Sequence, residues 1–138
     1  MKLIVHHMNT VLAVTRGLGS DTEHMRPMAD VNLVGYAGSA GERGMEAVRK
    51  LWDARCYEAV AIIPNATPAL RDDESGLDFA YYVTNSIDKP WTAAAHPNVH
   101  CLRPYGCRST SVGDVIEHVG KDGSEFHVVA SCGFIELK

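Results

Sequence analysis

The C-terminal part of the sequence limits the fold most, because it has the pattern of a β-hairpin. Two apolar-rich segments, 112–119 and 125–131, flank the turn sequence Gly-Lys-Asp-Gly at 120–123. Glycine and aspartate favour tight turns, and extended apolar segments on both sides of such a turn predict paired antiparallel strands. Residues 133–137 predict one further strand. The core is therefore expected to form at least partly on an antiparallel sheet.

Other strands are predicted from short apolar segments. Residues 56–63 contain a β-branched run that Pro64 stops, which is typical of a strand buried on at least one face, and this strand is expected at the centre of the sheet. The remaining predicted strands cover residues 1–5, 11–15 and 31–36, with a turn at 8–10 between the first two. Residues 99–102 are expected to be either irregular or an edge strand.

Two helices are predicted. Ser39 and Glu42 have the spacing of a capping box, and an apolar stripe at three- and four-residue steps follows as far as Trp52, so the first helix should end near Arg55. Ser75 and Asp78 have the spacing of a second cap, and Pro90 prevents the helix that begins there from continuing. Strands with two inserted helices predict an α+β fold with an antiparallel or mixed sheet.

Composition places the chain in one domain. Its 138 residues are 46% hydrophobic and 22% charged, which is enough for one real core. The single domain is divided into a β-rich N-terminal segment plus helix, 1–56, and a C-terminal half, 57–138. There is no apolar run of eighteen residues and no signal-peptide core, so a cytoplasmic protein without a membrane partner is expected. The net charge of -4 argues against a nucleic-acid polymer as partner.

A candidate ligand site is predicted just before the hairpin. Arg108 could clamp a phosphate, with Ser109 and Thr110 as short hydroxyl donors. The end of the second helix, from Asn85 to Trp91, is expected to form the opposite wall of the same pocket. In the alternative interpretation, the hydroxyls satisfy turn backbone and Arg108 pairs with Asp88 or Asp114.

Further ligand contacts are predicted from chemistry alone. Arg16 and Arg43 each lie in a glycine-rich segment that could cradle an anion, and the alternatives are a solvated loop and a simple helix cap. Phe79, Tyr82 and Trp91 could stack on a purine base whose edge the Asn85 amide reads, although aromatic residues at helical spacing are usually core.

An enzyme is the competing interpretation. His96, His100, Cys101 and Cys107 could be zinc ligands, but their spacing fits no standard motif and Pro97 prevents a helical pair of histidines. The four cysteines contain no Cys-x-x-Cys pair and are expected to be reduced. No catalytic triad stands out among the histidines and hydroxyls, so neither a catalytic residue nor a cofactor is predicted.

The segments 84–88, 90–91 and 108–116, together with Gly133-Phe134, resemble a pattern found in small uncharacterised proteins of bacteriophages and mobile elements. The resemblance covers residues 57–137, about the C-terminal half. The chain is also similar to the phage anti-Thoeris sponge proteins, which bind and sequester a cyclic ADP-ribose signal without cleaving it. This resemblance implies a homo-oligomer with pockets between subunits, a base stacked on Phe79 or Tyr82, and phosphates held by Arg108 and Thr110 beside Asn85.

The expected function is therefore that of a phage counter-defence protein in the host cytoplasm. It would bind a small signalling nucleotide, of the cyclic ADP-ribose type or a cyclic oligonucleotide, without cleaving it. Two alternatives stay open: a metal-dependent or hydrolytic enzyme acting on a nucleotide, and a protein-binding inhibitor of a host factor.

Overall fold

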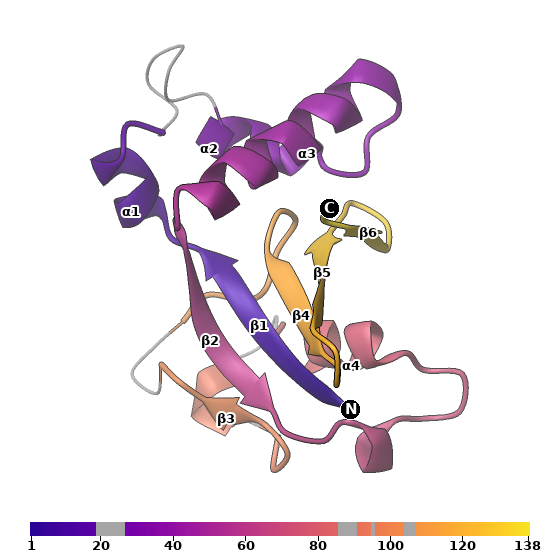
Figure 1. The fold of residues 1–138 in the computed structure, drawn as a ribbon. Helices are drawn as coiled ribbons and strands as arrows, with labels where there is room; N and C mark the ends of the chain where they lie inside the picture. The colour runs from indigo at the N-terminus through magenta and orange to yellow at the C-terminus, as the bar shows by residue number, and fades with distance from the viewer. Residues whose placement is uncertain (19–26, 86–90, 95, 104–106) are drawn as a thin grey trace.

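The computed structural model describes residues 1–18, 27–85, 91–94, 96–103 and 107–138. Its centre is a six-stranded antiparallel sheet with the strand order β3-β2-β1-β4-β5-β6 (Figure 1). The strands are β1 (Lys2–Met8), β2 (Tyr57–Ile63), β3 (His100–Cys101), β4 (Val115–Val119), β5 (Ser124–Val129) and β6 (Phe134–Glu136). The structure confirms the predicted α+β fold and its C-terminal hairpin, formed by β4 and β5.

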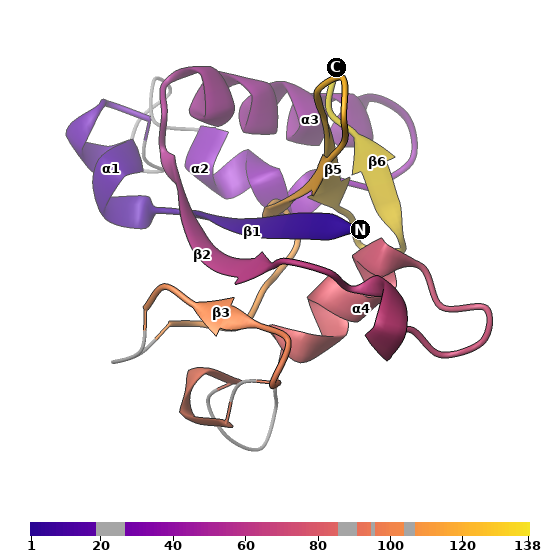
Figure 2. The same ribbon diagram turned by 60° about the horizontal axis from the view of Figure 1, so that its bottom comes forward.

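Helices cover both faces of this sheet. The α-helices are α1 (Thr10–Thr15), α2 (Pro27–Asp30), α3 (Gly38–Asp53) and α4 (Gly76–Val83), and the 3-10 helices are η2 (Val31–Leu33), η3 (Thr67–Ala69) and η4 (Trp91–Ala94). Figure 2 shows α1, α2 and α3 on one side of the sheet and α4 on the other. None of the helices in the described ranges is long and apolar enough to cross a membrane.

The core has two parts, one on each face of the sheet. Side chains alternate between the faces of a strand, so Leu3 and Val5 of β1 pack with Phe79 of α4 in the first part. In the second part, Val48 and Leu51 of α3 pack on Val115 of β4 and its neighbours. The apolar stripe predicted for the first helix is the surface that α3 buries.

The strand predicted at residues 1–5 is confirmed as β1, but the strands predicted at 11–15 and 31–36 are wrong. Residues 10–15 form α1, because the Asn9 side chain accepts a hydrogen bond from the Leu12 backbone N–H and caps a helix there. Residues 31–33 form a 3-10 helix. Gly35, two residues after this helix, has a φ of 93°, which is not the conformation of a β-strand. The described residues of the segment 1–56 are therefore mostly helical, and β1 is the one strand among them.

The order of the strands also differs from the prediction. β1 pairs with β2 on one side and with β4 on the other, so β1 and β4 occupy the centre, and β2 lies next to the edge strand β3. β1 and β2 are both apolar-rich and seven residues long, and the local sequence does not show which of them lies nearer the centre of the sheet. Of the two alternatives for residues 99–102, the structure shows the edge strand, which is β3.

Candidate functional site

Arg108 and Asp114 form an ion pair that ties the segment before the hairpin to the end of β1. The two terminal nitrogens of Arg108 donate to the two carboxylate oxygens of Asp114 over 2.6 and 2.7 Å. The same nitrogens donate to the carbonyls of Ser109 and Met8, and this bonding to Asp114 raises the pKa of Arg108. The structure thus selects the alternative interpretation in which Arg108 pairs with Asp114.

The Asp114 carboxylate is 1% exposed and is fully satisfied by this arrangement. Besides Arg108, it accepts hydrogen bonds from the backbone N–H groups of Met8 and Ser111. A buried carboxylate is stable only when donors and a countercharge surround it, so these contacts hold the loop 108–114 in one conformation.

A series of hydrogen-bonded side chains runs from the half-buried Cys107 through the buried His7, Thr110 and Thr84 to α4. The Cys107 Sγ lies 3.3 Å from His7 Nδ1, His7 Nε2 lies 2.8 Å from Thr110 Oγ1, and Thr110 Oγ1 lies 2.7 Å from Thr84 Oγ1. The Thr84 hydroxyl donates its proton to the Ala80 carbonyl.

Because each hydroxyl has one proton to donate, the donor and the acceptor of every hydrogen bond in this series can be assigned. Because Thr84 donates to Ala80, Thr110 must donate to Thr84, and its oxygen then accepts from His7. His7 is therefore the tautomer with its proton on Nε2, and its bare Nδ1 accepts from the Cys107 thiol.

The pKa values of His7 and Cys107 agree with an uncharged imidazole and an uncharged thiol at neutral pH. Burial lowers the pKa of His7 to about 4, against the attraction of Asp114, so the imidazole is uncharged at neutral pH. Burial also raises the pKa of the Cys107 thiol. The 3.9 Å contact between His7 Nε2 and Asp114 is consequently not an ion pair at neutral pH.

Two described residues of the predicted opposite wall, Asn85 and Trp91, contact the loop 108–110 directly. Asn85 donates to the Thr110 carbonyl over 2.7 Å, and the Trp91 indole donates to the Arg108 carbonyl over 3.0 Å. Thr110 is 0% exposed, and Trp91 and Phe79 are each 4% exposed. These three side chains therefore lie in the interior, where they support the loop, and the prediction that they face a ligand needs correction. Residues 86–90, including Asp88, lie outside the described residues.

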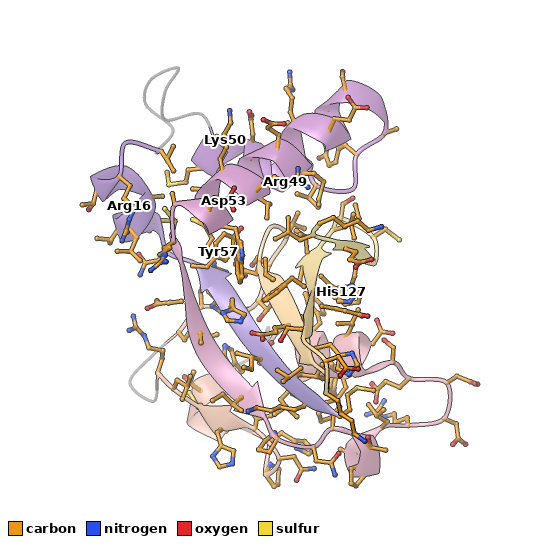
Figure 3. The ribbon with its side chains drawn as sticks, in the orientation of Figure 1. Arg16, Arg49, Lys50, Asp53, Tyr57 and His127 are labelled. Carbon is orange, nitrogen blue, oxygen red and sulfur yellow. The ribbon has the colours of Figure 1, made fainter. Side chains whose placement is uncertain are left out.

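The other predicted ligand residues are dispersed over the surface. Arg16 ends α1 and approaches the Cys56 thiol, while Arg43 is exposed on α3, and Figure 3 shows Arg16 on α1. Tyr82 is 63% exposed and carries the Arg71 guanidinium 5.5 Å above its ring. Ser109 is half-buried, and its carbonyl accepts from Arg108 and Ser111.

The glycines on either side of Arg43, Gly41 and Gly44, allow α3 to pack closely against the chain that precedes it. Gly41 and Gly44 are buried inside α3, and a Cβ on Gly44 would lie 2.6 Å from the Val34 backbone nitrogen. α3 starts after Ala37 with no side-chain cap, so the capping role predicted for Ser39 is wrong.

A cavity of about 410 Å³ lies beside the Arg108–Asp114 pair, and we call it the Arg108 cavity. Its polar lining comes from the ion pair itself and from three further residues, Thr10, Asn32 and Ser111. Its apolar lining comes from Met8, Met28, Ala29, Val31 and Val112. The Arg108 side chain is 43% exposed here. The cavity is of ligand size and combines a planar cation with apolar walls.

The sequence interpretation missed His7 as a partner of Cys107. The alternation of β1 could have placed His7 on the same face as Leu3 and Val5, but nothing local relates it to Cys107, which is a hundred residues away. Within the described ranges, no three His, Cys, Asp or Glu side chains are grouped so that they could hold a metal ion.

No family model, curated protein or solved structure matches this chain.

Proposed function

We propose that this protein binds a small nucleotide in the Arg108 cavity by non-covalent contacts and releases it unchanged. The observation that carries the proposal is the Arg108 guanidinium, which is held by the buried Asp114 and is still 43% exposed to a cavity of about 410 Å³. A cation fixed in advance needs little reorganisation when a ligand arrives.

The cavity lining supports a ligand with a flat ring and polar substituents. Both terminal nitrogens of Arg108 are occupied by protein acceptors, and its Nε has no partner among the residues that the structure describes. The guanidinium therefore offers its charge, one N–H and its planar face, on which a ring can stack. The Ser111 hydroxyl and the Asn32 amide supply polar groups nearby.

The hydrogen-bonded series from Cys107 to Thr84 supports binding without turnover. The one Cys–His contact among the described residues joins a protonated thiol to a neutral imidazole, because burial opposes both charges. A nucleophilic cysteine needs the thiolate, which this environment disfavours. The resemblance to anti-Thoeris sponge proteins gives such binding a role, in which a phage protein captures a signalling nucleotide in the host cell.

The test is direct binding followed by recovery of the ligand. Cyclic ADP-ribose isomers and a cyclic dinucleotide are titrated into the protein by calorimetry, and native mass spectrometry reports the bound ligand and the number of subunits. After heat denaturation, the ligand should return intact. A hydrolysed product would favour the enzyme interpretation, and no binding to any of these nucleotides would overturn the proposal.

One substitution locates the binding site. Ala29 is exposed on α2 and lines the cavity, so Ala29→Leu should fill part of it and weaken binding at least about tenfold. Ala37→Leu is the matched control, because Ala37 is exposed and lies outside the cavity. Equal affinities of the two variants would place the ligand elsewhere. A stoichiometric host protein recovered from lysate by the ligand-free protein would instead favour the inhibitor alternative.

A further inference from the structure

A second cavity, of about 450 Å³, lies where the end of α3 meets the start of β2. His6, Trp52, Asp53, Arg55 and Tyr57 line it, and we call it the aromatic groove. Figure 3 shows Asp53 at the end of α3 above Tyr57, which begins β2. None of the ligand contacts predicted from the sequence lies in this groove.

The rings of the groove are held in place from behind. Trp52 contacts the rings of His6, Tyr57 and Phe126, with centroid distances of 5.2, 5.2 and 5.1 Å. His6 Nε2 lies 2.9 Å from a Glu117 carboxylate oxygen, and the Tyr57 hydroxyl donates to the Gly113 carbonyl over 2.5 Å. These contacts fix the orientation of the rings before any ligand is present.

Three polar side-chain groups at this place have no partner among the described residues. The Asp53 and Arg55 side chains are exposed, and neither side chain makes a hydrogen bond or ion pair within the part of the chain that the structure describes. The Trp52 indole N–H also has no partner there. No unpaired side-chain nitrogen or oxygen is buried among the described residues, so this N–H reaches the surface. The groove thus combines an acceptor and two donors with aromatic rings.

Arg55 occupies a backbone position at which glycine is the favoured residue. Its φ is 58°, and it follows α3 as the left-handed residue of a Schellman motif, in which Arg55 N bonds to Trp52 O and Cys56 N bonds to Leu51 O. An L-residue costs free energy here, whereas glycine does not. Folding alone therefore does not explain an arginine at the rim of the groove.

We propose that the aromatic groove binds the heteroaromatic ring of a nucleoside. The ring stacks on the exposed surface of Tyr57, whose plane is tilted by 57° to that of Trp52, so that the Trp52 indole N–H can donate to the edge of the bound ring. Asp53 accepts from an exocyclic amino group, and Arg55 donates to ring nitrogen or carbonyl oxygen. The net charge of Asp53 and Arg55 is zero, which suits a neutral ring better than a phosphate or an ammonium group.

This site stands independently of the Arg108 cavity. The Tyr57 ring lines the groove, while its hydroxyl bonds to Gly113, next to Asp114 of the other cavity. The two sites share no lining residue, so each can be blocked by itself.

The experiment titrates adenosine and guanosine, which carry no phosphate, into the ¹⁵N-labelled protein. The two indole N–H signals are assigned with Trp52→Phe. The Trp52 signal should shift with saturation, whereas the Trp91 signal, whose N–H is bonded to the Arg108 carbonyl, should not. Absence of a Trp52 shift up to about 5 mM of both nucleosides would overturn the proposal.

Two variants test the polar contacts. Arg55→Gly and Asp53→Asn should each raise the dissociation constant about fivefold or more, and Arg55→Gly should melt at no lower temperature because glycine suits this position. Asp72→Asn, at an exposed carboxylate outside the groove, is the control and should bind like the parent. Unchanged affinity in both groove variants would refute the assignment.

Ala29→Leu distinguishes this proposal from the proposed function. It should weaken nucleotide binding at the Arg108 cavity and leave nucleoside binding at the groove unchanged. Loss of nucleoside binding in Ala29→Leu would show that the ring binds in the Arg108 cavity and would overturn the groove as its site.

Discussion

Buried polar residues determine how the loop before the hairpin is held. His7 is 3% exposed and Thr110 is 0% exposed, yet every polar atom of the series from Cys107 to Thr84 has a partner. A charge on any of these hydrogen-bonded side chains would destabilise the fold, because a buried ion without a countercharge is strongly disfavoured. The residues predicted as ligand contacts around Thr110 mainly support the fold.

The burial of His7 should make the stability pH-dependent. Its pKa is about 4 in the folded protein, below the ordinary value of 6.5, so between these values the unfolded chain binds a proton that the folded protein does not. The free energy of unfolding should then fall as pH drops from about 6.5 to 4, by roughly 3 kcal/mol in total, and His7 should contribute no pH dependence above that window.

Urea unfolding at pH 7 and pH 5 measures this fall. His7→Gln should be less stable at pH 7 and should lose most of the difference between the two pH values. His100→Gln, which alters an exposed histidine, should keep it. Equal pH dependence in His7→Gln and the parent would contradict the assignment of the effect to His7.

Arg108→Ala should destabilise the fold. It leaves the buried Asp114 carboxylate without its cation. Because Arg108 is itself half-exposed, we expect a cost of about 2–3 kcal/mol, less than for a pair in which both partners are buried. Arg103→Ala is the control, since its pair with Glu58 is more exposed and should contribute less than about 1 kcal/mol. Chemical denaturation compares the two variants, and equal costs would mean that burial of Asp114 is unimportant.

At the scale of elements, close packing decides where α3 lies. Its buried glycines allow the helix to approach the chain that precedes it, where a side chain would overlap backbone atoms. A helix brought this close buries Val48 and Leu51 fully against the sheet. Close packing therefore explains Gly41 and Gly44, whereas Gly38 has open space around it and a φ of 67°.

Gly44→Ala should lower stability even though alanine favours helices. The added Cβ would lie 2.6 Å from Val34 N and 2.7 Å from Leu33 C, both of which are backbone atoms that cannot rotate away. We expect a loss of about 1–3 kcal/mol, the usual range for overpacking. Thermal unfolding measures it, and a rise in the melting temperature would show that helix propensity outweighs the close contact.

The two predicted caps should behave differently. The Ser75 hydroxyl accepts from the Asp78 backbone N–H over 3.0 Å, so Ser75→Ala should cost about 1 kcal/mol. Ser39 is exposed and makes no cap, so Ser39→Ala should change stability by less than about 0.5 kcal/mol. Paired denaturation curves check both values, and a larger loss for Ser39→Ala would contradict the cap geometry.

At the scale of the molecule, one sheet separates two packed faces, and the four cysteines are distributed among different depths. Cys132 is exposed, Cys101 and Cys107 are half-buried, and Cys56 is 0% exposed. Their access to solvent is therefore decided by the whole fold, while their sequence spacing carries no information on it.

Thiol labelling should follow this order. With a colourless alkylating agent in excess, Cys132 should react first, Cys107 should be slowed by its raised pKa and its bond to His7, and Cys56 should react only when the whole domain unfolds. Peptide mass spectrometry at successive times gives the order. Rapid labelling of Cys107 ahead of Cys132 would indicate a thiolate there and revive the enzyme interpretation.

The sequence by itself determined the elements whose signal is local. The hairpin β4–β5, the apolar stripe of α3, the Ser75 cap and the β-branched run of β2 all depend on neighbours within a few residues. A period, a cap or a turn acts over that range, so these elements could be predicted.

Only the tertiary structure decided which partner each polar group has. Arg108 had several possible partners in sequence, and the fold chose Asp114 and the end of β1. Trp52 read as one residue of an apolar stripe, and the fold placed it between His6 and Phe126 at the wall of a groove. The burial of a side chain and the identity of its hydrogen-bond partner depend on segments that are far apart in sequence and come into contact only in the folded sheet. A local sequence pattern does not predict such contacts.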